Sequence, residues 1–477
     1  MPIDTIHADV TNAQEDWSLV RDCLAGQRVV KEAGDKYLPK LKDQEPEEYD
    51  AYKERAIFVN ATGRTHEAIM GLIFRKPPAM ELGEVGKTMT GDADLRGKGL
   101  IAYARQVVAE LAGVGRCGSL IDYSVEERRP YLAHYAAESI LNWRVQRVIV
   151  GGTGRNILTL LVLAEKYELT SDKFNPTMVD AWRVYEIVDG HVEASVHIRD
   201  GEQKEKFLEV SRAVPRRQGA MLQEIPFVFH NAYEPGEAVG KSPMSDIAVV
   251  NVAHYRQSAD HQNGLHICGI PTPYFFGGGA DDDTDEPLYL GSSSAWTSSD
   301  PNASAGFIEF SGQGLGAIAA SMTAMEGQMA ALGARLIEPR RADAEAFDTV
   351  ALRASAESST LARIGQQATE GIVNALAWCE WWGGTAATVV DAADGWTFAL
   401  NADFTSAAIT AESLTAWGNA RAANLVSEET YLHALRRGEA FPEGWTDEDE
   451  TGSKETNPPM PPPLPGGPPD KKPPPAK

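Results

Sequence analysis

The chain has 477 residues, of which 43% are hydrophobic, and its 44 basic and 68 acidic side chains give a formal net charge of −24. This length predicts two to four domains with a large core, and the acidic balance argues against a protein that grips nucleic acid through Lys/Arg clusters. The sequence has no long apolar run, which predicts no membrane segment, and its start has no signal-peptide pattern. Its four cysteines lie far apart, which predicts a reducing compartment and no zinc or disulfide framework.

The first part of the chain has the pattern of amphipathic helices followed by a buried strand. Pro46 suits the first turn of one helix, and Pro77-Pro78 is expected to end another after the apolar run 69–74. Helices are predicted over residues 16–33, 47–58 and 99–112, and a glycine-rich turn is predicted to lead into a buried strand at 119–123.

The middle of the chain, residues 143–229, alternates apolar and polar residues in short runs typical of strands. Strands are predicted over 145–150, 157–163, 181–188 and 191–198. Asp189-Gly190 between the last two is a hairpin signal. We expect this antiparallel meander to bury one face against helices.

Residues 240–339 predict two long helices separated by an irregular insert. Ser242 is expected to cap the first helix, with Pro243 in its first position and Asp246 near its positive end. Pro271 and Pro273 prevent that helix from continuing.

The insert contains the acidic run 281–286 and a predicted strand at 307–310. The second helix, predicted to end before Pro339, is rich in Ala, Gly and Met. Small residues let helices approach closely and Met adapts to imperfect contacts, so the pair suits packing against copies of itself.

The C-terminal part predicts further helices and then a low-complexity tail. A long helix is expected over 349–382, ended by Gly383-Gly384. Two strand-like runs are expected within 385–404, and short helices over 411–424 and 427–437. From Thr451 the sequence is low-complexity, with eleven prolines among residues 458–477, which predicts a disordered extended tail. A proline-rich ligand for another domain is the alternative reading.

Several local patterns suggest chemistry but lack its full requirements. The turn Gly312-Gln-Gly-Leu-Gly316 between a strand and a helix is similar to a nucleotide loop, yet its third glycine comes one residue early. His254, His261 and His266 do not share one tight helical face for a metal. Glu326 has no catalytic partner, so we expect an interhelical polar contact. The acidic run lacks the spacing of a calcium loop. We therefore predict no catalytic, cofactor or metal residues, no cofactor and no enzyme activity.

A set of short motifs in a fixed order resembles a family of tailed-phage proteins, long catalogued as a domain of unknown function and regarded as portal-like. The resemblance covers about residues 15–450. The motifs, in order, are Tyr52-x-x-x-Arg55-Ala56-x-Phe58-x-Asn60-x-Thr62-x-Arg64-Thr65, Ile73-Phe74-Arg75-Lys76-Pro77-Pro78, Gly115-Arg116-x-Gly118-Ser119-Leu120-Ile121-Asp122-Tyr123, Gly240-x-Ser242-Pro243-x-x-Asp246, His254-Tyr255, Phe307-Ile308-Glu309-Phe310-x-Gly312-x-Gly314 and Leu332-Gly333-Ala334-Arg335-Leu336.

The resemblance implies an α+β fold with the architecture of a phage portal. Its parts are expected to be a wing at 1–239, stem helices at 240–268 and 313–338, a clip at 269–312, a tunnel loop and long helix at 339–384, a wing return and helical crown at 385–450, and the tail at 451–477.

The resemblance also implies a function: a ring, expected to be a dodecamer, at one capsid vertex, through which double-stranded DNA passes without sequence-specific binding. Expected partners are the major capsid protein, scaffold, the large terminase and a head–tail adaptor, with no membrane; the expected location is the virion, after assembly in the host cytoplasm. The tunnel loop places Glu338, Arg340, Arg341, Asp343, Glu345 and Asp348 in the DNA channel, and the clip offers Asp281, Asp282, Asp283, Asp285 and Glu286 to a partner.

Two other functions stay open from the sequence. One is a different structural virion component, such as an adaptor or minor capsid protein. The other is a nucleotide-binding enzyme that uses the Gly-Gln-Gly-Leu-Gly turn.

Overall fold

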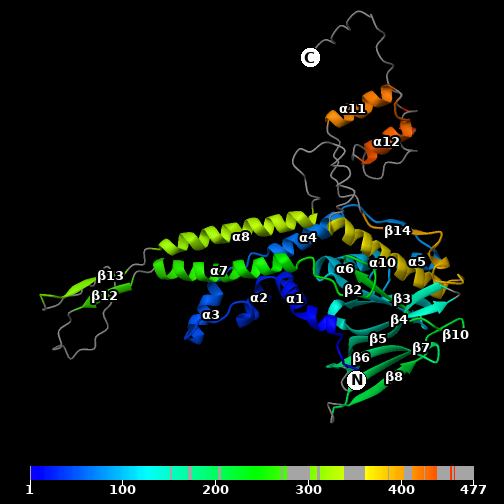
Figure 1. The fold of residues 1–477 in the computed structure, drawn as a ribbon, viewed down its shortest axis with the longest axis horizontal. Coiled ribbons are helices and arrows are strands. Elements are labelled where there is room, and N and C mark those ends of the chain that lie inside the picture. The colour runs from blue at the N-terminus through cyan, green and yellow to red at the C-terminus, as the bar shows by residue number, and fades with distance from the viewer. Residues whose placement is uncertain are drawn as a thin grey trace, which may run out of the picture. The chain divides into compact units, whose positions relative to one another are not determined.

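The computed structural model describes residues 2–150, 153–169, 174–201, 206–269, 272–276, 301–308, 312–337, 360–384, 386–401, 411–423, 425–437, 452, 453 and 456. The chain divides into two compact units, residues 1–403 and 404–477. Within the described residues, helices and sheets are both abundant (Figure 1), which confirms the predicted α+β class.

The N-terminal helices mostly follow their predicted positions. They are α1 (Ala8–Ala25), α2 (Gln27–Glu32), the 3-10 turn η1 (Gly34–Lys36), α3 (Pro46–Arg55), α4 (Ala61–Ile73), α5 (Glu84–Met89) and α6 (Leu100–Gly113). The single helix predicted over 16–33 is wrong: Gly26, at φ 89°, separates α1 from α2. Pro46 starts α3 as expected, and Ile69 and Ile73 of α4 are fully buried.

A three-stranded antiparallel sheet forms the centre of the first unit, in the order β11 (Phe227–Asn231), β2 (Arg116–Ser124), β3 (Arg129–Ala136). Helices α6 and α10 (Thr360–Gly383) pack against it with side chains that are almost completely buried. Gly115, which immediately precedes β2, adopts φ 87°, and a Cβ there would lie 3.2 Å from Pro243 Cδ. The turn therefore requires glycine, and it brings β2 against the start of the first long helix.

The predicted meander is a five-stranded antiparallel sheet: β4 (Ile140–Val150), β5 (Thr153–Leu169), β6 (Thr177–Val188), β7 (His191–Arg199) and β8 (Phe207–Ala213). Asp189 and Gly190 form the expected turn, both at positive φ. The fifth strand, β8, was not predicted. We expected helices to cover one face of this sheet, and that expectation is wrong. The described contacts of one face are with β3, where Tyr135 Oη donates to Glu165 of β5. Those of the other face include the N-terminal segment at Ile3.

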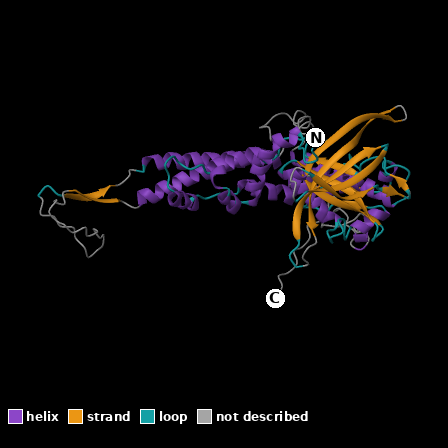
Figure 2. Ribbon diagram, turned by 90° about the horizontal axis from the view of Figure 1, so that it is seen from below, coloured by secondary structure: helices purple, strands orange, loops and turns teal. Residues whose placement is uncertain are grey.

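The two long helices lie side by side in both ribbon views (Figures 1 and 2). They are α7 (Ser245–Gly269) and α8 (Gln313–Ile337), each of 25 residues. In the chain, α7 is followed by strand β12 (Thr272–Phe276) and α8 is preceded by strand β13 (Ser304–Ile308), which pair antiparallel. The predicted strand at 307–310 is thus shifted toward the N-terminus, and its partner β12 was not predicted.

After α10, which ends at the predicted glycine pair, one of the two expected strands is present among residues 386–401. Thr388 N donates to Asp391 Oδ2 and Asp391 N donates to Thr388 Oγ1, which favours the 3-10 turn η3 (Asp391–Ala393) over a strand. Strand β14 (Thr397–Ala399) then pairs with β1 (Ala79–Glu81). Residues 349–359 of the predicted long helix lie outside the described residues.

Three short elements complete the first unit: η2 (Ala137–Ser139) and the two-stranded pair β9 (Arg216–Arg217) and β10 (Ala220–Met221). In the second unit, α11 (Ala411–Ala422) and α12 (Glu428–Arg437) pack against each other. Ser427 Oγ accepts a hydrogen bond from Thr430 N at 3.1 Å, so α12 starts where the sequence predicts.

Candidate functional site

The motif beginning at Tyr52 holds the first long helix in place. Asn251 of α7 is fully buried, and its Oδ1 accepts hydrogen bonds from Thr62 N (3.1 Å) and Thr62 Oγ1 (3.0 Å) while its Nδ2 donates to Val59 O (2.7 Å). Farther along α7, Tyr52 Oη donates to Asp260 Oδ1 at 2.5 Å. The motif residues thus clamp α7 rather than form a reactive centre.

Two further contacts complete this clamp. Ile57 N donates to the buried Ser258 Oγ at 3.0 Å, and Asn60 Oδ1 caps α4 by accepting from Gly63 N at 2.7 Å. Each satisfies a backbone donor at the end of an element, where no helical partner exists. The extended segment between α3 and α4 therefore lies along α7 in one register.

Helices α7 and α8 run antiparallel and approach closely. His254 Nε2 of α7 lies 3.3 Å from Glu326 Oε1 of α8, which confirms the interhelical contact expected for Glu326. At Gly264 a Cβ would lie 2.5 Å from Leu315 Cδ2, so the helices touch there through glycine. Of the other predicted histidines, His266 is exposed, and no cluster of three or more metal-binding side chains occurs among the described residues.

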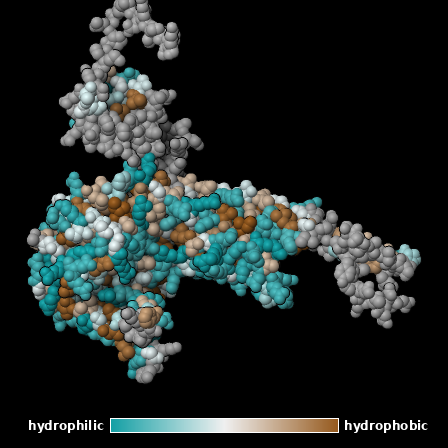
Figure 3. All heavy atoms as spheres, turned by 180° about the vertical axis from the view of Figure 1, so that it is seen from behind, coloured by the Kyte–Doolittle hydropathy of each residue, from teal (hydrophilic) through white to brown (hydrophobic). Residues whose placement is uncertain are grey.

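One face of α8 is exposed and made of small or uncharged residues. We call it the α8 face; it comprises Gln313, Gly316, Ala320, Ala324, Gly327, Ala331 and Ala334. In Figure 3 pale to brown spheres follow the edge of the helix pair where α8 lies, and hydrophilic residues dominate below it. Because this face carries no charged side chain, it offers no ion pair to a partner or to nucleic acid.

The β12–β13 hairpin exposes apolar side chains. Tyr274 packs on Phe276 with ring centroids 5.1 Å apart, while Phe276 and Phe307 are 64% and 53% exposed. Isolated two-stranded hairpins are marginally stable in water. The acidic residues predicted beside this hairpin, 281–286, lie outside the described residues, as do all six predicted channel residues from Glu338 to Asp348.

A buried chain of hydrogen bonds was missed by sequence reasoning. Tyr103 Oη and Ser119 Oγ lie 2.5 Å apart, and Ser119 Oγ lies 2.6 Å from His230 Nε2. All three side chains are at most 1% exposed, and burial lowers the pKa of His230 to about 3. A Ser–His pair can activate a nucleophile, but this one has no access to substrate and joins α6, β2 and β11 structurally.

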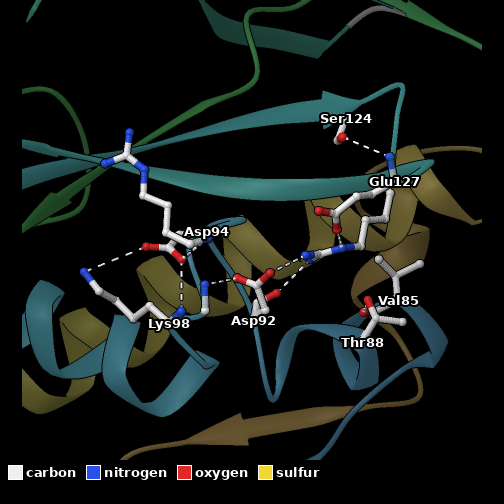
Figure 4. Close-up of polar contacts among 10 residues, drawn as sticks. Val85, Thr88, Asp92, Asp94, Lys98, Ser124 and Glu127 are labelled. Atoms are coloured by element: carbon white, nitrogen blue, oxygen red, sulfur yellow. Dashed lines mark hydrogen bonds and ion pairs between the residues drawn. The ribbon is translucent and has the colours of Figure 1, made fainter. Parts of the chain in front are cut away.

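A cavity of about 750 Å³ lies between the loop 92–98 and strands of both sheets. Several of its polar side chains bond to one another: Arg183 Nε donates to Glu165 Oε1 at 2.7 Å, and Tyr131 Oη donates to Asp122 Oδ2 at 3.1 Å. In the loop beside it, Asp94 Oδ1 accepts from Lys98 N at 3.1 Å (Figure 4). The cavity holds no arrangement of nucleophile, base and oxyanion donors.

The glycine-rich turn before α8 does not form a dinucleotide site. Gly312 adopts φ 64° and its carbonyl accepts from Leu315 N at 3.0 Å, which starts the helix. The preceding strand β13 pairs only with β12 among the described residues. A dinucleotide fold requires a parallel sheet beside the turn, so the turn is a hinge into α8.

A family model described as a domain of unknown function (DUF4055) matches residues 243–383. No curated protein matches the chain. Among the described helices, none combines the length and apolar character needed to cross a membrane.

Solved structures that resemble the chain come from gene transfer agent (GTA) particles. A chain of the virion of the native GTA particle is 13% identical, with 85% of this chain and 98% of that chain covered and a TM-score of 0.38. A chain in the neck of the empty GTA particle, computed with C6 symmetry, is 11% identical (78% and 89% covered, TM-score 0.39). One in the neck of the native particle, computed with C12 symmetry, is 13% identical (82% and 94%, TM-score 0.37). These scores are too low to support a functional conclusion.

Proposed function

We propose that this chain is a structural virion protein of a tailed phage and, more specifically, a portal subunit. The observation that carries the proposal is the helix pair α7–α8. Two helices of 25 residues, each about 37 Å long, run antiparallel and are connected through the segment that contains the β12–β13 hairpin. This is the order stem, clip, stem that the sequence resemblance implies.

The α8 face supports assembly into a ring. Its Ala and Gly side chains permit the backbone of another helix to approach closely, and its lack of charge removes the cost of desolvating ions. On this proposal, copies pack side by side through their stems, and twelve copies close the ring.

The charge of the chain supports a passive channel. Protein groups that neutralise phosphates provide most of the affinity for DNA, and here 68 acidic side chains outnumber 44 basic ones, so the net charge of −24 repels phosphates. Double-stranded DNA would pass without sequence-specific binding while a separate terminase supplies the work. The capsid protein, scaffold and head–tail adaptor are the other proposed partners, with assembly in the host cytoplasm and residence in the virion.

The proposal includes two assignments of specific residues, one in the clip and one in the channel. The acidic residues 281–286 of the clip would face a basic partner. Glu338, Asp343, Glu345 and Asp348 would line the channel. Replacing these four by lysine is expected to impair DNA packaging or ejection while rings still form, and unchanged packaging in such rings would contradict the channel assignment.

The native mass of the purified protein tests the proposal. A closed ring of about a dozen subunits with a central hole is the expected result. A monomer that persists at high concentration and with scaffold protein present would refute it.

A variant sharpens the test. Ala320→Lys with Ala324→Lys places two charges on the α8 face and is expected to abolish the ring without changing the subunit's circular dichroism. Gln14→Lys, at an exposed position of α1, is the matched control that should assemble normally.

A further inference from the structure

A groove of about 290 Å³ runs between strand β11 and helix α10. Its apolar wall contains Phe227 and Phe229 of β11 and Trp378 of α10, and its rim carries Gln367, Glu370 and Asn374 of α10. Strand β11 lies at the edge of its sheet. The groove is therefore bordered by a strand edge on one side and by aromatic and amide side chains on the other.

Close packing fixes the two walls of this groove. A Cβ at Gly371 of α10 would lie 2.2 Å from His230 Nδ1 of β11, so glycine lets the helix approach the strand. Phe227 and Phe229 also pack edge to face, with ring centroids 4.9 Å apart. Walls held in this way are preformed and need little rearrangement to accept a ligand.

The polar groups of the groove are mainly N–H donors that can bind a ligand, together with one carboxylate. Within the described residues, the Asn374 amide and the Trp378 indole N–H have no hydrogen-bond partner, and Asn374 and Glu370 are exposed. In the part of the chain that the structure describes, Glu370 accepts hydrogen bonds from Gln366 and Gln367, neither of which carries a charge. The groove thus suits an apolar peptide that offers carbonyl oxygens and a nearby cation.

We propose that this groove binds a proline-rich segment in the polyproline II conformation, and that the occupant is residues 458–475 of a second copy of this chain. Proline lacks an N–H, so such a segment offers carbonyl acceptors and a preformed apolar ridge, which aromatic grooves recognise. Eleven prolines occur in residues 458–477, and Lys471 and Lys472 complement Glu370.

The length of the segment is sufficient for exchange between neighbours. Eighteen residues at 3.1 Å each extend about 55 Å in polyproline II. The choice of a second copy rests on the proposed function, because a ring of subunits supplies one tail from another copy for every groove. Tail and groove would then link adjacent subunits outside the stem.

Disulfide trapping between two full-length variants tests the proposal. Both carry Cys268→Ser, which removes the partly exposed native cysteine and leaves the buried Cys23, Cys117 and Cys379. One variant also carries Asn374→Cys and the other Leu464→Cys. Mixed, assembled and mildly oxidised, they are expected to form a crosslinked dimer in high yield. Gln366→Cys, exposed on α10 but not part of the groove, is the matched control and should crosslink at least fivefold less.

Two further variants test whether the side chains of the groove are responsible for the crosslinking. Trp378→Ala and Glu370→Lys should each reduce crosslinking, and Lys471→Glu with Lys472→Glu should restore it for Glu370→Lys only. Equal yields from the groove and control cysteines would overturn the proposal. If the native mass reveals rings but crosslinking fails, the tail proposal alone is wrong; if no rings form, the proposed function fails first.

Discussion

Replacing Asn251 by alanine should strongly destabilise the first unit. The change deletes three hydrogen bonds, at 2.7, 3.0 and 3.1 Å, that join α7 to Val59 and Thr62. It also leaves the fully buried Thr62 without the acceptor of its N–H and hydroxyl, whereas the Val59 carbonyl still accepts from Ala61 N at 2.8 Å. The structure of α7 itself is expected to persist, since alanine favours helix.

The magnitude follows from the cost of unpaired groups. A buried donor or acceptor left without a partner costs about 1–3 kcal/mol, so the N–H and the hydroxyl of Thr62 together give about 2–6 kcal/mol. In a domain of 150–250 residues each kcal/mol lowers the melting temperature by about 2–4 °C. The first unit is roughly twice that size, so we expect a decrease of about 2–12 °C.

Thermal unfolding followed by circular dichroism at a fixed subunit concentration measures this effect. Gln262→Ala, on the same helix and without a hydrogen bond among the described residues, is the matched control and should change the melting temperature by less than 1 °C. If Asn251→Ala behaved like the control, the clamp would not position α7, and the role assigned here to the Tyr52 motif would be refuted.

Three further predictions concern buried polar groups. Glu380→Ala removes the carboxylate that accepts from Gly86 N at 2.7 Å and should cost about 1–2 kcal/mol in thermal unfolding; Glu380→Gln should retain much of that stability, and an equal loss in both would contradict a capping role. Burial raises the pKa of Glu138, but the hydrogen bonds and charge of Arg21 outweigh it and hold the pKa below the usual 4.5. This stabilisation is present above pH 4.5 and lost as the pH falls through the folded pKa, so Glu138→Gln should flatten the acid side of the melting profile. Burial lowers the pKa of His230 from 6.5 to about 3; the unfolded chain takes up the proton first, so stability should fall as the pH drops from 6.5 toward 3, and His230→Gln should reduce that slope.

Local signals explain which elements could be predicted. Pro46, the Asp189-Gly190 turn and Ser427 each act on the next few residues, and the structure has an element boundary at each of them. Gly26 misled the helix prediction because a single glycine inside a periodic run is tolerated in many helices, whereas here its φ of 89° ends α1. The strand expected before Asp394 failed for a similar local reason, the reciprocal Thr388–Asp391 bonds.

Long-range partners explain what could not be predicted. Asn251 and Thr62 are separated by 189 positions, and His230 and Ser119 by 111. No periodicity links such pairs, so the sequence identifies the Tyr52 motif but not its task. The small-residue composition of α8, in contrast, was foreseeable, because the sequence alone defines it; its packing against copies stays a prediction.

The distribution of polar contacts along the helix pair bears on how a ring could close. Helices α7 and α8 touch at Gly264, where a Cβ would lie 2.5 Å from Leu315 Cδ2. His254 and Glu326 provide a directional contact between the two helices, while Asn251 and Ser258 fix the register of α7 against residues 57–62. In a proposed ring of twelve, an angular error in one stem repeats at every interface, so closure requires a defined stem direction more than a large interhelical area. The buried amide at Asn251 fits that requirement better than an apolar residue of the same size, because leucine there could pack but could not select one register for residues 59–62.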